Sequence, residues 1–346
     1  MRYILLMFIT VLTGSPAVWA QSEKPEIQVK ENKAEKKVDV LVGGELFTSY
    51  IYPDNIKKPV LWPVMSPDGH VLTRSYPMVN KAGDRTDHPH HVGVWLNYGD
   101  VNGLDFWNNS EAIPPKDKDG YGTIYHQSIE NTKSGKGEAS LTTTAVWKSP
   151  EDKTLLKEKT EFDFIAMDEI RIIDRTTTLT AAIDEVKFTD NKEGMFAIRV
   201  ARELELPSDE PTELMDSRGN VTKVEKMDNT DVKGDYRSSE GIEGGEVWGT
   251  RAEWMKLSSE IEGEVVSLVI IDNPTNPGYP TYWHARGYGL FAANTLGQKV
   301  FSEGKEEMNF SLKKGESVTF RYRLVVAGEN LTDERINELA EGYAEL

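Results

Sequence analysis

Short runs of apolar and β-branched residues recur along most of the chain and are separated by turn residues such as glycine, proline and asparagine. In residues 169–181 polar and apolar positions alternate, which is typical of a strand with one solvated face and one packed face. The segments between these runs lack the 3.6-residue period of a helix. Strands are expected within residues 38–42, 45–52, 61–65, 70–76, 140–148, 155–166, 169–181, 186–191, 195–207, 265–272, 288–294, 308–314 and 317–327.

These runs predict an all-β fold, and their number favours a large antiparallel two-sheet sandwich over a simple immunoglobulin-type domain. The sandwich is expected to span residues 38–330. One helix is predicted in residues 331–346, where Thr332 can cap the first turn and acidic residues suit its positive end. Its apolar residues share one face, which indicates that the helix packs on the sandwich: Ile336, Leu339, Ala340 and Tyr343.

The amino terminus has the features of a secretory signal peptide. Residues 3–12 are largely apolar, and Val18 and Ala20 occupy the −3 and −1 positions of a cleavage site, so residues 1–20 are expected to be removed on export. Residues 21–37 are dense in charge and are expected to form a leader outside the core. A secreted or periplasmic location follows.

Charge and composition exclude several classes of function. The full chain has a formal net charge of −17 from 57 acidic and 40 basic residues, which argues against a nucleic-acid partner. The absence of cysteine excludes disulfides, thiolate nucleophiles and the lipidated cysteine of a bacterial lipoprotein. No stretch after the signal peptide reaches the roughly 18 apolar residues of a membrane-spanning helix.

One long segment, residues 208–245, is acidic, rich in glycine and poor in apolar residues. It is expected to run over one end of the sandwich. Two interpretations are open at this point: a lid over a site, or a disordered surface loop.

The most conspicuous candidate chemistry is a cluster of histidines. His88, His90 and His91 fall within four residues and follow Asp87. A strand would place His88 and His90 on one side and His91 on the other, so that two imidazoles could reach one substrate or one metal ion. Neutral imidazole serves both as a metal ligand and as an acid–base group, and both uses are open. The sequence requires no cofactor, although the cluster could hold a divalent metal.

Three residues outside the cluster could complete a catalytic set: His126, Glu203 and His284. A lone histidine in a strand is as often a packing residue as a functional one. Arg199 and Glu203 are expected to share one face of a strand, with Arg202 on the other face. Glu203 is then either a general base or one half of a structural ion pair.

Residues 99–107 combine a turn with groups that suit a saccharide. Asn102-Gly103 is a strong turn signal, and Trp95, Asp105 and Trp107 lie close to it in the sequence. A carboxylate accepts hydroxyl protons, and an indole packs on the apolar face of a pyranose. The alternative is an ordinary tight turn with a core tryptophan.

Four segments resemble the PmoA-like family, which is frequent in secreted proteins of carbohydrate-degrading bacteria and is also catalogued as a domain of unknown function. The segments are DHPHHVGVW at residues 87–95, GDVNGLDFW at 99–107, VWGTRAEW at 247–254 and DNPTNPGYPTYWHARGYGLFAANTLG at 272–297. Val92 and Asn273 depart from the family pattern, in which arginine and histidine are expected at these positions.

The resemblance implies a fold and a kind of site. Members of the family look like galactose-mutarotase-type supersandwiches, whose sugar site lies on the concave face of one large sheet and uses pairs of histidines with a carboxylate. The family name points to methane oxygenase, but the membrane subunits of that enzyme need hydrophobic spans that this chain lacks. The name therefore does not guide the functional hypothesis.

The leading hypothesis is a secreted carbohydrate-active protein, an enzyme of polysaccharide degradation that acts on a sugar or oligosaccharide by hydrolysis, elimination or epimerisation. Acid–base chemistry is assigned to His90, His126, Glu203 and His284. Guanidinium groups suit a carboxylate or sulfate on the substrate. Substrate contacts are expected from His88, His91, Trp95, Asp105, Trp107, Arg199, Arg251 and Arg286. Two alternatives are a non-catalytic glycan-binding protein and a histidine-ligated metal protein with redox chemistry.

Overall fold

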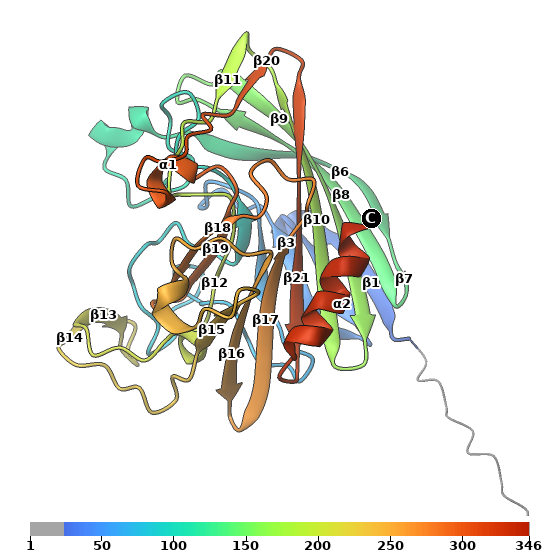
Figure 1. Cartoon of the computed structure of the whole chain (residues 1–346), viewed down its shortest axis with the longest axis vertical. Helices are drawn as coiled ribbons and strands as arrows, with labels where there is room; N and C mark the ends of the chain where they lie inside the picture. Colours follow the sequence, from blue (N-terminus) through green and yellow to red (C-terminus); the bar gives the residue numbers. More distant parts are fainter. Residues whose placement is uncertain (1–23, 346) are drawn as a thin grey trace, which may run out of the picture.

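The computed structural model describes residues 24–345, so the signal peptide expected over residues 1–20 lies outside the described residues. Two large antiparallel sheets make up most of the fold, with loops and a few short helices around them (Figure 1). The all-β, two-sheet sandwich expected from the strand pattern is confirmed.

One sheet has nine strands in the order β18-β19-β12-β5-β4-β3-β2-β1-β7. Its strands are β1 (Glu26–Asn32), β2 (Lys37–Val42), β3 (Glu45–Ile51), β4 (Val60–Val64), β5 (Val94–Leu96), β7 (Gly135–Lys136), β12 (Phe196–Arg199), β18 (Tyr282–Arg286) and β19 (Leu290–Asn294). The strand order brings together segments from both ends of the chain.

The other large sheet has eight strands in the order β15-β16-β17-β21-β10-β9-β8-β6. Its strands are β6 (Thr123–Lys133), β8 (Glu138–Lys148), β9 (Thr154–Met167), β10 (Ile170–Ala181), β15 (Asp235–Ser238), β16 (Trp254–Ile261), β17 (Glu264–Asp272) and β21 (Ser317–Ala327). Two small sheets pair β11 (Glu185–Lys187) with β20 (Ser311–Lys313) and β13 (Thr212–Met215) with β14 (Val221–Val224). The helices are α1 (Gln298–Phe301), α2 (Asp333–Ala344) and the 3-10 turns η1 (Lys33–Glu35), η2 (Pro115–Gly120), η3 (Arg202–Leu204) and η4 (Gly244–Val247).

The main hydrophobic core fills the space between the two large sheets. It takes inward-facing residues from both, such as Val40 of β2, Phe196 of β12 and Leu324 of β21, all fully buried. Residues at alternate positions point outward and form two further apolar layers. One layer lies between the eight-stranded sheet and α2, and the other covers the outer face of the nine-stranded sheet.

The first half of strand β10 departs from the expected pattern of one solvated face and one packed face, whereas the second half follows it. Ile173 points into the main core, whereas Ile172 packs outward under α2. Asp174 lies opposite Arg323 of β21, is buried, and accepts two hydrogen bonds of 2.7 Å from its guanidinium. Arg323 also donates to the carbonyl of Leu339 in α2 at 2.9 Å. Both faces of this first half are covered, because the helix shields one of them.

Helix α2 is confirmed where the sequence predicts it. It begins at Asp333, and the side chain of Thr332 accepts a hydrogen bond from the backbone N–H of Arg335. Ile336 and Tyr343 are buried in the apolar layer on the eight-stranded sheet. The helix therefore closes one outer face of the sandwich.

Residues 26–32 form strand β1 and do not belong to a charged leader. β1 pairs antiparallel with β2, and Ile27 and Val29 are buried in the main core. The polar side chains between them point outward, so two apolar positions are enough for a half-buried strand. The expectation of a leader over residues 21–37 is wrong for this stretch, because pairing with β2 orders it despite its low apolar content.

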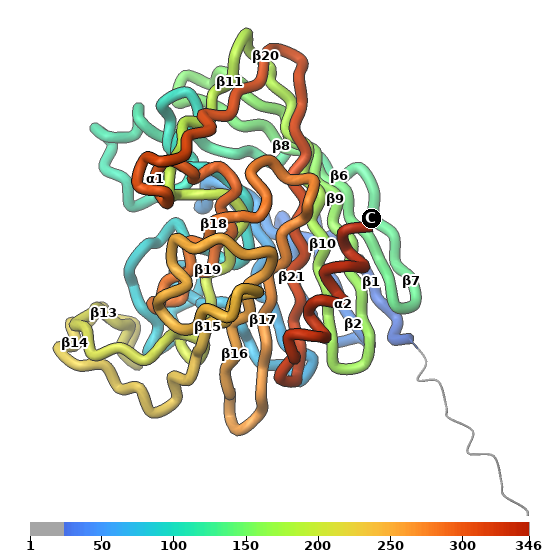
Figure 2. Tube along the Cα trace, in the orientation of Figure 1, coloured from blue at the N-terminus to red at the C-terminus, as the bar shows by residue number. Residues whose placement is uncertain are grey.

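The acidic segment of residues 208–245 contains regular structure. The hairpin β13–β14 projects from the sandwich at the lower left of Figures 1 and 2, and β15 joins the edge of the eight-stranded sheet. The guanidinium of Arg85 donates to the hydroxyl of Thr212 at 3.0 Å and ties the hairpin to the loop before the histidine cluster. The interpretation as a disordered loop is therefore wrong.

We expect Ile336→Ala to lower the free energy of unfolding by about 2–5 kcal/mol, because truncating a fully buried side chain leaves a cavity under α2. Glu341→Ala, at an exposed position of the same helix, is the matched control and should change it by less than about 0.5 kcal/mol. Urea unfolding followed by tryptophan fluorescence measures both values. Equal losses would show that α2 does not stabilise the sandwich by packing.

Candidate functional site

The outer face of the nine-stranded sheet lies next to most of the residues singled out in the sequence. Trp95 of β5, Ala197 of β12 and Leu290 of β19 belong to the apolar layer on this face. Arg199 follows Ala197 by two residues on β12, so its side chain lies on the same face. The loop of residues 85–91 packs onto this layer through the ring of His91, which stacks on Trp95.

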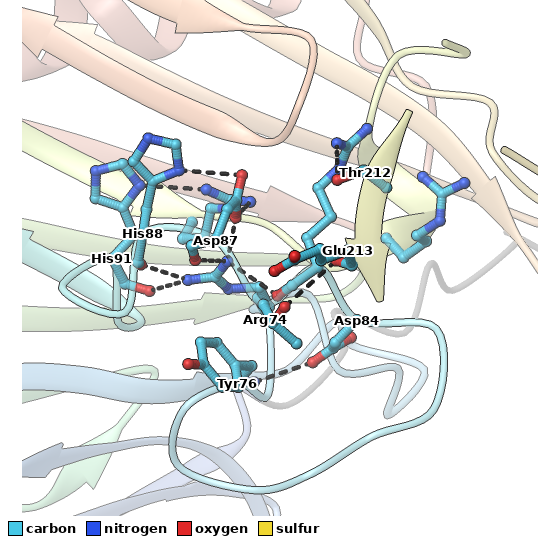
Figure 3. Close-up of polar contacts among 12 residues, drawn as sticks. Arg74, Tyr76, Asp84, Asp87, His88, His91, Thr212 and Glu213 are labelled. Atoms are coloured by element: carbon cyan, nitrogen blue, oxygen red, sulfur yellow. Dashed lines mark hydrogen bonds and ion pairs between the residues drawn. The ribbon is translucent and has the colours of Figure 1, made fainter. Parts of the chain in front are cut away.

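The histidine cluster lies in a turn, not in a strand. The backbone N–H of His91 donates to the carbonyl of His88 at 3.0 Å, and His88 has a φ of +43°. Pro89, between them, cannot donate to a strand ladder. The rings of His88 and His91 stack at 4.9 Å with 5° between their planes (Figure 3). The expected alternation, with His88 and His90 on one side of a strand and His91 on the other, is therefore wrong.

A buried arginine sets the shape of this turn. Arg74 is 2% exposed, and its guanidinium donates at 2.8–3.2 Å to the backbone carbonyls of Arg85, Asp87, His88 and His91 (Figure 3). Buried carbonyls need hydrogen-bond donors, and here one side chain supplies them. The chain must curl around Arg74 to bring four carbonyls to it, which accounts for the turn.

Asp87 links the turn to the sheet. Its Oδ1 accepts hydrogen bonds from Arg74 at 2.8 Å and from Arg199 at 2.6 Å, and its Oδ2 lies 3.0 Å from Nδ1 of His88. Burial opposes ionisation of this carboxyl, but His88 and the two arginine charges outweigh burial and hold the pKa of Asp87 well below its usual value. The carboxylate is therefore ionised and lies beside the ring of His88.

His91 and His90 are buried and neutral. Nε2 of His91 accepts from the indole of Trp107 at 3.2 Å, and its Nδ1 lies 3.2 Å from Arg199. Burial lowers the pKa of His91 well below its usual value and that of His90 to about 2. Nε2 of His90 is buried and has no hydrogen-bond partner among the described residues. His91 thus anchors the turn to the sheet as a neutral ring.

Beside the turn, a partly open surface combines aromatic and charged groups. The side chain of His88 is 40% exposed, and its ring stacks on Tyr288 at 5.1 Å with 3° between the planes. The guanidinium of Arg199 lies 4.9 Å from the centre of the Tyr288 ring. Arg286, the exposed last residue of β18, lies 5.9 Å from the same ring and 5.5 Å from the ring of Trp248. We name as the His88 surface the residues Asp87, His88, Trp248, Arg286 and Tyr288.

His284 lies two residues before Arg286 on β18 and is buried. Its Nδ1 lies 2.9 Å from the carbonyl of Lys192 and 3.9 Å from a carboxylate oxygen of Glu193. Burial lowers the pKa of His284 to about 3, so the ring is neutral and donates from Nδ1 to the carbonyl. This hydrogen bond joins β18 to the loop that carries Lys192.

A cavity of about 280 Å³ lies beside His90 and is lined mainly by apolar groups, with Lys58 among the polar ones. Lys58 is 4% exposed; its ammonium donates to the carbonyl of His90 at 2.7 Å and lies 5.2 Å from the centre of the Trp95 ring. Within residues 24–345 it has no carboxylate at ion-pair distance. Burial lowers the pKa of Lys58 to about 7, and the more distant charge of Asp105 opposes this shift.

His126 lies in a neighbouring cavity of about 340 Å³, apart from the other clustered residues. Its Nδ1 is 3.0 Å from the hydroxyl of Tyr50, and its ring stacks on Tyr52 at 3.9 Å. Burial lowers the pKa of His126 to about 4. Residues 56–58 line both this cavity and the one beside His90, so the two histidines belong to adjacent hollows.

Glu203 and Arg199 do not share a strand face. β12 ends at Arg199, and the chain then enters the short turn η3. A carboxylate oxygen of Glu203 accepts from Lys81 at 3.2 Å, while Arg202 donates to Glu205 at 2.8 Å. The expectation of a common face for Arg199 and Glu203 is wrong, because the strand stops before it reaches Glu203.

Residues 99–107 form a tight turn. The nearby tryptophans, Trp95 and Trp107, belong to the core and are not exposed to a saccharide. Trp95 and Trp107 are fully buried, and their rings meet edge to face at 5.2 Å. Asp105 accepts from the backbone N–H groups of Trp107 and Asn108 at 2.8 and 2.9 Å, which stabilises the turn. Arg251 is likewise engaged, by two backbone carbonyls and a carboxylate. These side chains serve packing and local structure.

The histidines do not converge on a position for a metal ion. In the described part of the chain no group of three or more His, Asp or Glu side chains is arranged to hold one. Both ring nitrogens of His91 already face other side chains, those of Trp107 and Arg199. The geometry therefore offers no support for the metal-site alternative.

Four residues that shape this region carried no functional expectation from the sequence: Lys58, Arg74, Trp248 and Tyr288. Lys58 and Arg74 are cations next to apolar runs, a pattern that can signal a buried charge in need of a partner. Trp248 and Tyr288 adjoin glycines in segments that were singled out for other residues. No local pattern distinguishes these two rings from core aromatics.

A sequence-family model matches residues 37–341, and its description is a family of unknown function, DUF6807. The name PmoA-like, suggested by the resemblance of four segments, is not the one that this match supplies. No curated protein matches the chain. Among residues 24–345, no helix is long and apolar enough to cross a membrane.

Several solved structures match the chain at low identity. The GH36 α-galactosidase AgaB from Geobacillus stearothermophilus is 11% identical, with a TM-score of 0.42 and coverage of 88% of this chain and 41% of that one. A galactose mutarotase related enzyme from Lactobacillus acidophilus is 11% identical, with a TM-score of 0.27 and coverage of 89% and 98%. The chain spans about two fifths of the length of the α-galactosidase. At such identities the likeness concerns the fold alone.

The buried lysine makes stability depend on pH above neutrality. Lys58 has a pKa of about 7 in the folded protein against 10.5 as its ordinary value, so between these values the unfolded chain binds more protons. The free energy of unfolding should therefore rise with pH from about 7 to 10, by at most about 1.4 kcal/mol per pH unit from this residue. Lys58→Met should remove that increment.

Lys57→Met is the matched control, because the adjacent Lys57 is paired with Glu111. Urea unfolding of the three proteins at several pH values between about 7 and 9 measures the effect. Identical slopes in the wild type and in Lys58→Met would contradict burial of Lys58 without a counter-charge.

Proposed function

The chain belongs to the DUF6807 family of unknown function, and we propose that it is a secreted carbohydrate-active enzyme that binds a saccharide at the His88 surface. The observation that carries the proposal is the ring of His88, which faces the ionised carboxylate of Asp87 and stacks on Tyr288 while 40% of its side chain stays exposed. Secretion rests on the signal-peptide features of residues 1–20.

The groups around His88 suit a saccharide. Trp248 is 39% exposed, and an indole face packs against the apolar C–H face of a pyranose. Asp87 and Arg286 offer planar groups that can accept from and donate to sugar hydroxyls. Burial raises the pKa of Tyr288 to about 12, so its hydroxyl remains a hydrogen-bond donor at neutral pH. Aromatic faces and fixed polar groups thus lie together at an open position.

Asp87 and His88 act as an acid–base pair in this proposal. The Asp87 carboxylate faces Nδ1 of His88, favours the tautomer protonated at that nitrogen, and stabilises the imidazolium that forms when Nε2 takes a proton. Nε2 is then the atom that removes a proton from a ring carbon or returns one to a leaving oxygen. Hydrolysis, elimination and epimerisation all use such a transfer.

In this proposal His88 carries the acid–base role, in place of the residues that were expected from the sequence. Of the three clustered histidines, His88 alone is substantially exposed. Burial keeps His90 and His284 neutral, with pKa values of about 2 and 3, and His126 lies in a separate cavity. Glu203 lies in the turn η3 after β12 and is engaged by Lys81.

We expect His88→Gln to lower kcat/KM by at least about 100-fold on a substrate found by product analysis of plant and algal oligosaccharides, because Gln cannot exchange a proton. His70→Gln is the matched control: His70 also faces a carboxylate, that of Glu264 at 2.9 Å, but this pair involves the eight-stranded sheet. Its turnover should equal that of the wild type. Circular dichroism verifies that both variants fold.

Two results would contradict the enzyme proposal. Unchanged turnover in His88→Gln would remove this residue from the reaction. A saccharide that binds the wild type tightly and is recovered unaltered after long incubation would establish a glycan-binding protein instead.

A further inference from the structure

One arginine on the His88 surface has no polar partner. Arg286 is exposed, and among residues 24–345 it is the arginine whose guanidinium makes neither a hydrogen bond nor an ion pair. The other arginines of residues 24–345 make hydrogen bonds or ion pairs with carbonyls, hydroxyls or carboxylates: Arg74, Arg85, Arg171, Arg175, Arg199, Arg202, Arg218, Arg237, Arg251, Arg321, Arg323 and Arg335.

This lack of a partner is unexpected in so acidic a chain. Acidic residues outnumber basic ones by 57 to 40, so an exposed cation readily finds a carboxylate. The carboxylates whose charges act on Tyr288, those of Asp87 and Glu193, are already engaged. Asp87 binds two arginines, and Glu193 pairs with Lys192. Arg286 therefore keeps a positive charge that the protein itself does not neutralise.

Two aromatic rings hold this guanidinium in place. Arg286 lies 5.5 Å from the centre of the Trp248 ring and 5.9 Å from that of Tyr288. Such contacts use the faces of the rings and leave N–H edges of the guanidinium free for a ligand. The chain next to Trp248 is joined to β18, because the backbone N–H of Gly249 donates to the carbonyl of Trp283 at 2.8 Å. The side chain is thus oriented before any ligand arrives, which reduces the entropy lost on binding.

The charges close to Arg286 sum to a positive value although the whole chain is acidic. The Asp87 carboxylate is shared by Arg74 and Arg199, which leaves an excess of one positive charge in that group. Arg286 adds a second positive charge next to it, through their common contact with Tyr288. An anionic group is attracted to this position, whereas the formal net charge of −17 would repel it elsewhere.

We infer that Arg286 binds the anionic group, a carboxylate or a sulfate ester, of an acidic saccharide held on the His88 surface. The inference rests on the proposed function and names its substrate class. A guanidinium edge donates two parallel hydrogen bonds to the oxygens of a carboxylate or sulfate. The exposed face of Trp248 beside it packs on the apolar face of a sugar ring, so that one saccharide unit satisfies both side chains.

Isothermal titration calorimetry of the mature chain tests the inference with three probes of equal length: an oligogalacturonate, a sulfated galacto-oligosaccharide and a neutral galacto-oligosaccharide. The wild type should bind at least one acidic probe about tenfold or more tightly than the neutral one. Arg286→Gln should abolish that preference, because it should lower the affinity for the preferred acidic probe about tenfold or more and the affinity for the neutral probe by much less. The acidic probe that is preferred identifies the anionic group.

Arg335→Gln is the matched control, because Arg335 is also exposed but is paired with Glu338 at 2.7 Å. It should bind all probes as the wild type does. Arg286→Lys keeps the positive charge but cannot donate two parallel hydrogen bonds. It should therefore retain only part of the preference for the acidic probe. Circular dichroism confirms that each variant is folded.

Failure of the inference and failure of the proposed function look different in this experiment. An acidic preference that persists in Arg286→Gln, or equal binding of acidic and neutral probes by the wild type, overturns the inference while the binding itself upholds a saccharide site. Absence of binding to these probes and to every saccharide of the product screen overturns both.

Discussion

The carboxylate of Asp87, partly exposed but held by two buried arginines, is the contact on which the rest of the candidate site depends. It neutralises two guanidinium groups, that of Arg74 in the segment before the turn and that of Arg199 on β12. Arg74 shapes the turn through four backbone carbonyls, and Arg199 lies against the ring of Tyr288. Removing one member of a buried charged group costs about 3–5 kcal/mol, so these residues act as one unit. The position of the His88 ring follows from that unit.

The two outer faces of the sandwich differ in how completely they are covered, because a helix covers one and loops cover the other. Helix α2 packs along the eight-stranded sheet and is held by Arg323, which joins Asp174 to a carbonyl of the helix. Loops cover the nine-stranded sheet, and they bring side chains from distant parts of the chain to one place. A packed helix fills its sheet face with its own side chains. Loops leave an edge such as the His88 surface partly open to a ligand.

The histidines of this region differ in their protonation and in their access to a ligand because their environments differ. Burial keeps His90, His91 and His284 neutral, since an imidazolium would have to leave water. His88 has the same side chain but lies at the rim, with an ionised carboxylate on one side and solvent on the other. Acid–base chemistry and hydrogen bonding to a ligand both require such access. Arg286 is likewise exposed, and among residues 24–345 it is the arginine whose guanidinium has neither a hydrogen bond nor an ion pair.

By itself the sequence determined features that depend on neighbours along the chain. Alternation specified strand β10, and Thr332 with the acids after it specified the start of α2. The tertiary structure alone decided that residues 26–32 are a strand, that the histidines form a turn, and that the ring of His88 stays exposed to solvent. Each of these depends on a partner far away in sequence, such as β2 for the first strand and Arg74 for the turn. Spacing within a segment carries no information about such partners, because hydrogen bonds and ion pairs across the sandwich are set by folding.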